Sequence, residues 1–395
     1  MSTTPNFPGF DPTRTSRLVD GVAPNGKPIV SLIFGVTFAV GKDGACTGRR
    51  SELAEEYLTV KASVPTRWTK PSLLVRDVDL YAWRNLTDLV VQGVARVDKP
   101  TRSFEVTLQA TGSIKPLKQT LVCTGDRFVD KGSGGLVASE PEELDEIHLS
   151  YENAYGGTDE EAEEVLLDRE LVDFMTKSLG PEENEELSFF SYPRNPAGKG
   201  YLVHEIGAVG TPLPNLEFAD DRLSMAQLIR PMEEWGARPM PAAFDWQHPA
   251  WFPRCAFLGD FPPTADDRLP ELERKLGLFD ERFDKLAIID RPKHGFANGA
   301  HPYLARRRFE GDERISVTHT SRDGREFLVK LPGLKPSVSL TLPGEAKVKV
   351  PASVDLVFVE TELDQVTVVW RATHFREREH LPLGWEERCE PKIHW

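Results

Sequence analysis

Three side chains in the central part of the chain have the chemistry needed to transfer protons. Glu152, His204 and Glu217 offer two carboxylates and an imidazole, the groups used most often as general acids and bases. Arg254 and Arg371 could bind Glu152 or Glu217 in bidentate ion pairs, which would pin loops together or leave an arginine to capture an acidic group of a partner. These residues allow a hydrolase or lyase using Glu152, His204 or Glu217, although the sequence does not show that they meet.

The elements that must position these groups lie in the stretch 151–217, which is dense in glycine, proline and asparagine. Glycine reaches backbone conformations that other residues reach only at a cost, and proline fixes φ and removes a donor. Asparagine in turns can bond the local backbone in place of a strand partner. We therefore expect an irregular but fixed connection that holds sheets together, in preference to a reactive site. Its candidate motif residues are Glu152, Gly156, Gly157, Asn195, Gly198, Gly200, Asn215 and Glu217.

Several common reaction motifs are missing from the sequence. It has no Gly-x-x-x-x-Gly-Lys-Ser/Thr phosphate loop, no Gly-x-Gly-x-x-Gly turn after a strand, no Gly-x-Ser-x-Gly elbow and no His-Glu-x-x-His helix. The nine histidines fit no tight metal-binding spacing. We expect no cofactor, no metal and no catalytic residues. The four cysteines form no Cys-x-x-Cys pair and are expected to be buried thiols in a reducing compartment: Cys46, Cys123, Cys255 and Cys389.

Charge and length limit the class of partner. The 395 residues carry a net charge of −14, which disfavours nucleic acid and favours a basic partner. No apolar run is long enough to span a membrane, and the N-terminus lacks the pattern of a secretory signal, so we expect a cytoplasmic protein with no membrane contact. The chain exceeds the usual size of a single core, which predicts two or three lobes.

Period-two hydrophobic patterns dominate the first of these lobes, residues 1–147. The run 29–40 predicts a long central strand. The segments 73–83, 89–97 and 103–110 predict antiparallel strands with one face in water. The segment 118–124 is expected to pair with 127–129 around a Gly125-Asp126 turn. This lobe should be a sandwich or a barrel-like sheet.

The centre, residues 148–300, has a different composition. The acidic segment 159–186 begins with a helical pattern over 159–175. Helical spacing over 270–287 predicts a second helix at Phe279–Lys285. Between 222 and 268, prolines prevent long regular elements. The rings of Trp235, Trp246 and Trp251 would cap a core edge or line a groove, and in the groove case a carbohydrate-binding module is a further alternative.

Residues 301–395 return to strand patterns, with turns expected at 321–324 and 363–365. The predicted fold class is mainly β. It consists of two antiparallel β-sandwich or barrel-like regions joined by an irregular Gly/Pro-rich centre with a few short helices. The strands expected in this last lobe cover 314–319, 326–331, 337–342, 346–350, 354–360 and 365–371.

An ordered set of short motifs resembles domain-of-unknown-function family 2169, a group of bacterial proteins found with type VI secretion genes. The likeness runs from about Ile29 to Trp370. Asn153 and Tyr155 depart mildly from the usual first motif, the acidic segment 159–186 resembles an insertion, and 258–263 is a degraded element. The pieces that carry the resemblance are Leu149–Gly157, Arg194–Tyr201, Leu213–Glu217, Trp251–Arg254, Phe279–Phe283 and Val369–Arg371.

This resemblance implies a non-enzymatic adaptor or chaperone. Such proteins are thought to hold a secreted effector, often one with a PAAR-like tip domain, and to help load it onto the VgrG spike. It implies no catalytic residues. The partner segment would bind by strand addition at a sheet edge or by side-chain capture in a groove. The resemblance adds Trp251, Arg254, Trp370 and Arg371 to the candidate motif or partner-binding residues.

Overall fold

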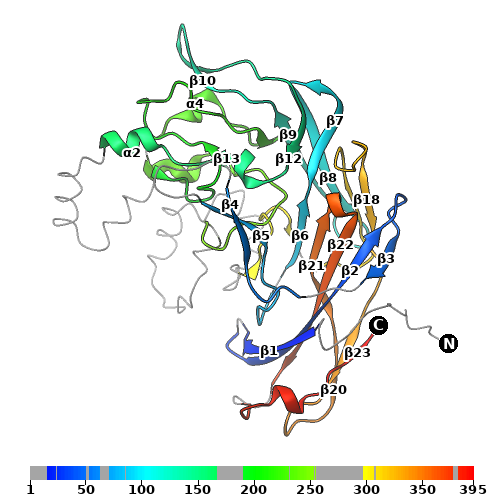
Figure 1. The fold of residues 1–395 in the computed structure, drawn as a ribbon. Coiled ribbons are helices and arrows are strands. Elements are labelled where there is room, and N and C mark those ends of the chain that lie inside the picture. Colours follow the sequence, from blue (N-terminus) through cyan, green and yellow to red (C-terminus); the bar gives the residue numbers. More distant parts are fainter. Residues whose placement is uncertain are drawn as a thin grey trace, which may run out of the picture.

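The protein is mainly β, as the sequence predicts, and its strands form several sheets with no closed barrel among the described residues (Figure 1). The structure, a computed structural model, describes residues 16–23, 25–49, 53–62, 71–84, 86–166, 190–230, 232–252, 254, 297–306, 308–376 and 381–395. The expected helix Phe279–Lys285, the motif piece Phe279–Phe283, Cys255 and residues 167–175 of the first predicted helix lie outside these ranges.

The largest sheet joins strands from both ends of the chain. Its strand order is β1-β2-β22-β21-β6-β16, with β3 beside β2. All neighbours are antiparallel except β21 and β6, which are parallel. The strands are β1 (Ser16–Val22), β2 (Pro28–Val40), β3 (Cys46–Arg49), β6 (Thr87–Gln92), β16 (Ala305–Arg306), β21 (Ser353–Glu360) and β22 (Gln365–Phe375).

A five-stranded sheet also combines distant segments, in the order β15-β9-β8-β17-β18. A three-stranded sheet, β20-β19-β23, is built from the last part of the chain. The bounds are β8 (Ser103–Thr111), β9 (Leu117–Thr124), β15 (Leu216–Phe218), β17 (Arg314–Val317), β18 (Phe327–Lys330), β19 (Ser337–Leu340), β20 (Val348–Pro351) and β23 (Lys392–His394).

The remaining elements are short. Four two-stranded pairs are formed, β4-β5, β7-β12, β10-β11 and β13-β14. Their strands are β4 (Leu58–Lys61), β5 (Ser72–Arg76), β7 (Val94–Thr101), β10 (Val129–Gly132), β11 (Gly135–Ala138), β12 (Leu144–His148), β13 (Tyr155–Gly156) and β14 (Lys199–Gly200). The described helices are η1 (Tyr151–Asn153), α2 (Glu160–Leu166), α4 (Met225–Leu228), η3 (Met232–Ala237), η7 (Thr361–Leu363) and η8 (Glu386–Arg388).

One hydrophobic core lies between the two large sheets. Its main cluster contains Leu32 and Phe34 of β2 together with Val106 and Leu108 of β8, all at most 1% exposed. The two β-rich regions, 1–147 and 301–395, are thus joined by strand pairing and by a shared core as well as by the chain between them.

Several local predictions are confirmed. The expected strand 29–40 is β2, and its apolar run is buried because it pairs on both sides in the centre of the sheet. The expected turns at 321–324 and 363–365 connect β17 to β18 and β21 to β22. In the second turn Asp364 takes the left-handed conformation, with φ 49°. The predicted helix at 159 begins as α2, where Asp159 Oδ1 accepts from the Ala162 N–H at 3.1 Å.

Two strand predictions are wrong. The segment 73–83 forms strand only to Arg76, and its polar side chains Asp77 and Asp79 are buried, not in water. The segment 127–129 does not pair with 118–124, because β9 is already paired with β8 and β15, and Val129 instead begins the β10–β11 hairpin. The prediction that all cysteines are buried is confirmed for Cys123 and Cys389, whereas Cys46 is half-buried.

The segment 89–97 is divided at Gly93, where β6 leaves the seven-stranded sheet and β7 pairs with β12. A Cβ atom at Gly93 would lie 2.0 Å from Thr361 Oγ1, closer than any real contact. The close approach of η7 therefore requires glycine at this break.

Substitution Gly93→Ala is expected to lower the free energy of unfolding by about 1–3 kcal/mol, because the new methyl group overpacks the contact with Thr361. The measurement is urea denaturation. Gly134→Ala is the matched control, since a Cβ there meets nothing within 4 Å. Equal midpoints for the two variants would contradict the steric explanation.

Candidate functional site

Asn195 ties two of the motif pieces together. Its side-chain Nδ2 donates to the backbone carbonyl oxygens of Tyr151 at 2.8 Å and Tyr155 at 3.1 Å. Its backbone carbonyl oxygen accepts from the Gly157 N–H at 2.9 Å. The side chain is fully buried. An amide in this place replaces the strand partners that an irregular backbone lacks, as the sequence predicts.

The glycines of the motif lie where the two chain segments touch. β13 and β14 are parallel, with Tyr155 beside Lys199 and Gly156 beside Gly200. Gly156 has φ +152° and a Cβ there would lie 2.1 Å from the Asn195 carbonyl oxygen, so only glycine fits. Gly198 donates its N–H to the same oxygen at 3.3 Å. These glycines allow close backbone packing and present no reactive group.

A buried layer of tyrosines and arginines packs against the place where β13 and β14 meet, which we call the crossing. Arg238 Nη1 donates to Tyr155 Oη at 2.8 Å, and its guanidinium lies 4.6 Å from the ring centre of Tyr201. Tyr192 Oη donates to the Pro239 carbonyl at 2.9 Å and accepts from Arg194 Nη1 at 3.3 Å. Burial raises the pKa of Tyr155 above its usual value, so its hydroxyl stays protonated. The layer fixes the crossing from one side.

Glu217 and Asn215 join the third motif piece to the five-stranded sheet. Buried Glu217 accepts from Arg127, from Arg222 at 3.2 Å and from the Leu223 N–H at 2.8 Å. Asn215 Nδ2 donates to the Thr124 carbonyl at 2.9 Å, and its Oδ1 accepts from Lys199. Both side chains are occupied by groups of the protein itself.

The two members of the predicted acid–base pair lie on different local structures. Glu152 lies on half-buried η1, whereas His204 is exposed on a turn and its Nδ1 accepts from the Ile206 N–H at 3.1 Å. These positions come from the described residues, and the joint acid–base role of Glu152 and His204 stays a prediction.

The predicted ion pairs of the arginines have other partners. Arg254 Nη2 lies 2.8 Å from Asp77 Oδ2, and Arg371 Nε lies 2.5 Å from Asp355 Oδ2. Glu217 pairs with Arg127 and Arg222, as described above, so its expected pairing with Arg254 or Arg371 is wrong. Both arginines still act as clamps, but on carboxylates that the sequence did not single out.

These clamps belong to a buried ionic network. Arg84 lies between Asp88 at 3.4 Å and Asp77 at 3.9 Å, and Arg76 pairs with Asp79 at 2.9 Å. Asp88 also accepts from the Gly299 N–H at 2.9 Å. Asp77, Asp79, Arg84, Asp88, Arg254, Asp355 and Arg371 are all at most 3% exposed. The network links β5, β6, β21 and β22 to residue 254.

Burial and ion pairing oppose each other in this network. Burial raises the pKa of Asp77, although Arg254 and Arg84 oppose the rise. For Asp355, burial also acts to raise the pKa, but Arg371, Arg308 and Arg84 lower it below its usual value. The ionised form of Asp355 is therefore stabilised by three cations, and its charge holds β21 to β22 through Arg371.

The motif tryptophans lie in the core. Trp251 is 4% exposed and meets the Tyr151 ring edge-on at 5.5 Å. Trp246 packs on Phe358. Trp370 is 1% exposed and stacks on Phe34. The predicted core position is thus confirmed for Trp246 and Trp251. The Trp235 side chain lies outside the described part of the structure.

Among the described residues, no group of three or more His, Cys, Asp or Glu side chains is placed to hold a metal ion. Likewise, none of the described helices is long and apolar enough to cross a membrane. The motif side chains described above instead bind one another or the backbone.

The comparison with protein families decides which group this architecture represents. A family model described as an uncharacterized protein conserved in bacteria, DUF2169, matches residues 25–371. The chain belongs to this family. Searches of curated proteins and of solved structures found no match. The match spans the crossing around Asn195 and the buried ionic network, so both lie within the DUF2169 region.

Sequence reasoning missed the acidic half of the network in this DUF2169 chain. The string Arg76-Asp-Val-Asp79 has the period of a half-exposed strand, so it predicts that the side chains of Asp77 and Asp79 face the solvent. Arg84 is the residue that could have revealed the network, because Arg and Asp residues that alternate close to apolar residues are also typical of a buried ionic network. Asp88 and Asp355 lie inside apolar strands, where a lone carboxylate requires a partner.

Asp245 is a second unpredicted titrating group. Desolvation raises the pKa of Asp245 to about 7, and the negative charge of Glu152 adds to the rise. Hydrogen bonds from Gln92 Nε2 at 2.8 Å and from the Trp246 N–H at 2.7 Å act in the opposite direction. The carboxyl group thus carries a proton in the folded protein at mildly acidic pH and loses it near neutrality.

Substitution Arg254→Met is expected to lower the free energy of unfolding by about 3–5 kcal/mol, because the buried carboxyl group of Asp77 then loses the nearer of its two arginine partners. Chemical denaturation at pH 7 measures it. Arg102→Met is the matched control: Arg102 is 62% exposed in its pair with Glu140, and loss of such a pair costs about 0–1 kcal/mol. A similar decrease in the free energy of unfolding for both variants would show that the buried ion pair contributes no more to stability than the exposed one.

Asp245→Asn tests the raised pKa. Between about pH 4 and pH 7 the unfolded carboxyl is ionised while the folded one keeps its proton, so the wild type loses stability as pH rises. The variant lacks this loss and should gain about 2–4 kcal/mol relative to the wild type on going from pH 4 to pH 8. Denaturation at both pH values gives the difference, with exposed Asp130→Asn as the control. A difference that does not change with pH would rule out the raised pKa.

Proposed function

We propose that this DUF2169 chain is a cytoplasmic type VI secretion adaptor or chaperone that binds an effector with a PAAR-like domain and assists its loading onto the VgrG spike. The resemblance of the motif set to proteins thought to have that role supports the proposal, and the matched family model covers residues 25–371. The observation that carries it is that Asn195, Glu217, Arg254 and Arg371 are buried and bound to other parts of the protein. Their role is to hold a rigid framework for a recognition surface.

An exposed apolar group next to the framework suits such a role. Phe128 and Val137 are each 40% exposed. They share the outer face of the β10–β11 hairpin, because Val129 and Ala138 form the inward-facing pair. Phe128 also lies opposite exposed Pro212, just before the third motif piece. The hairpin stands at the top of the molecule in Figure 1.

Acidic residues surround this apolar group. The segment 126–146 contains seven acidic and two basic residues, and all seven acidic side chains are exposed. Glu142 donates its N–H to the Asp126 carbonyl at 2.9 Å, which holds the acidic segment beside the strand of Phe128. A partner segment with apolar side chains between basic ones would match both features.

The test is co-expression with an effector that carries a PAAR-like domain, followed by affinity and size-exclusion chromatography. We expect a stoichiometric complex, and Phe128→Asp should weaken it by about tenfold or more, because a carboxylate enters an apolar contact. The matched control is Leu383→Asp, since Leu383 is 98% exposed and lies on the C-terminal segment.

Absence of a complex with any such effector would overturn the adaptor proposal. A complex that Phe128→Asp and Leu383→Asp affect equally would show that binding occurs elsewhere. Circular dichroism of both variants verifies that each is folded.

A further inference from the structure

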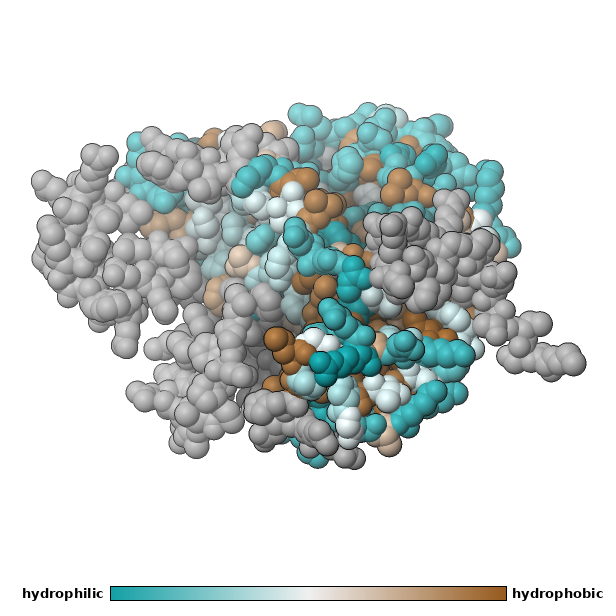
Figure 2. Space-filling model, turned by 60° about the horizontal axis from the view of Figure 1, so that its bottom comes forward, coloured by the Kyte–Doolittle hydropathy of each residue, from teal (hydrophilic) through white to brown (hydrophobic). Residues whose placement is uncertain are grey.

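The three-stranded sheet β20-β19-β23 has one apolar and one polar face. Val338, Leu340, Val348 and Ile393 pack against the main core. Because side chains alternate along a strand, the residues between them face outward. This sheet lies at the lower end of the molecule in Figure 1, and hydrophilic residues cover much of the described surface of that end (Figure 2).

Strand register aligns lysines on the outer face. Ser339 is paired with Lys349 of β20 on one side and with Lys392 of β23 on the other, so a hydroxyl lies between two ammonium-bearing side chains. Lys347, just before β20, lines the same hollow as Lys392. Three lysines thus share one small surface.

These lysines form no ion pair with described residues, although Glu387 and Glu390 line the same hollow as Lys347 and Lys392 and offset part of their charge. By contrast, Lys335 nearby pairs with Glu310 at 3.0 Å. Like charges on neighbouring strands repel each other and destabilise a sheet. In a protein with net charge −14, such a concentration of unpaired cations favours an anion at this place.

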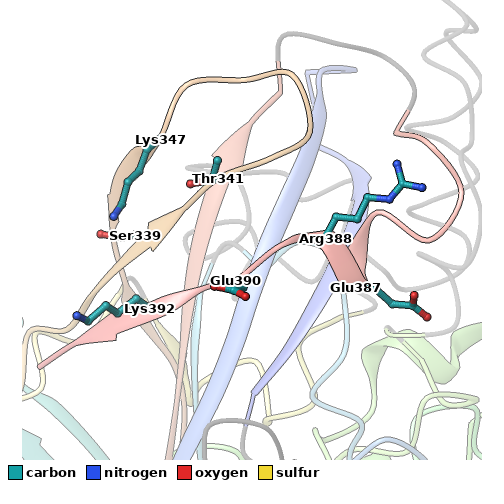
Figure 3. A pocket seen from close by; sticks show the side chains of 7 residues that line it. All are labelled: Ser339, Thr341, Lys347, Glu387, Arg388, Glu390 and Lys392. Atoms are coloured by element: carbon teal, nitrogen blue, oxygen red, sulfur yellow. The ribbon is translucent and has the colours of Figure 1, made fainter.

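A hollow of about 360 Å³ opens beside Lys347 and Lys392. Lys347 and Lys392 lie on the side of the hollow that holds Ser339, while Glu387 and Arg388 lie at the opposite side (Figure 3). Ser339 is 8% exposed, and its Oγ shares a hydrogen bond with His394 Nε2 at 2.9 Å. When the imidazole donates, the hydroxyl proton of Ser339 remains for an anion.

We propose that this hollow binds a small phosphate monoester whose organic part carries hydroxyl groups, as in a sugar phosphate. Lys347 and Lys392 neutralise the phosphate, and the hydroxyls of Ser339 and Thr341 donate to its oxygens. Glu390 accepts from a hydroxyl group of the organic part. The negative charges of Glu387 and Glu390 also repel a long polyanion that would extend along the hollow.

The site depends on the C-terminal segment of this chain. Glu387, Glu390 and Lys392 lie beyond residue 371, where the family match ends. The inference does not rest on the adaptor role, since it uses only the sheet face and its cations.

The experiment is calorimetric titration of the full chain with inorganic phosphate and with glucose 6-phosphate at low ionic strength. We expect saturable binding, tighter for glucose 6-phosphate. Lys392→Gln and Lys347→Gln should each weaken it about tenfold, because each removes one charge-assisted contact. The control is Lys335→Gln, which removes the same charge from a lysine outside the hollow and should bind as the wild type does.

Failure of both probes to bind saturably would overturn the proposal. So would an equal loss in Lys335→Gln and Lys392→Gln, because binding would then follow net charge and not the hollow. Chemical shift changes confined to Ser339, Thr341 and their strand neighbours in an NMR titration would support it. Changes spread over the lysines of the whole surface would contradict it.

Discussion

The fold depends on the burial of ionised groups in its centre. Asp77, Arg84, Asp88, Asp355 and Arg371 come from segments up to nearly 300 residues apart, and each is at most 3% exposed. A buried charge is tolerated only with a partner, so these segments must assemble together or not at all. Such networks often add little to stability compared with apolar packing, and their value lies in excluding other arrangements. Here they fix how β5 and residue 254 sit against the sheet of β21 and β22.

The crossing around Asn195 extends the same constraint by other means. There the groups that need partners are backbone N–H and C=O groups, left open by an irregular path through glycines and prolines. Asn195 and Asn215 supply them with side-chain amides, and Gly156 permits the contact distance. Arg238 and the tyrosines close the layer. A centre with little regular structure can thus be as fixed as a sheet, because its polar groups are satisfied.

The sequence predicts this protein well where a pattern is local. The run 29–40 gives β2, and the turns at 321–324 and 363–365 give hairpins, because hydrophobic period and turn residues act within a few positions. It fails where the decisive partner is distant. Asp77 follows the period of an exposed strand, and only Arg254, 177 residues away, makes its burial possible. The pairing of β2 with β22 and of β6 with β21 could not be predicted for the same reason, since no local pattern encodes which strands pair when about 300 residues separate them. Among the candidate site residues, the roles of Asn195 and the glycines were predictable from their chemistry, whereas the partners of Arg254 and Arg371 were not.

A division of labour between interior and surface follows from these two features. When arginine, glutamate and asparagine side chains are all engaged inside, their substitution alters the framework before it alters any contact with a ligand. The side chain of Phe128 and the acidic side chains from Glu140 to Glu146 are exposed, and the ion pairs of Glu140 with Arg102 and of Glu146 with Arg96 lie at the surface. Surface chemistry can therefore differ without cost to the fold, while the interior stays as it is. Under the adaptor role proposed above, the exposed residues would recognise the partner, and the buried motif residues would set the shape in which that surface is presented.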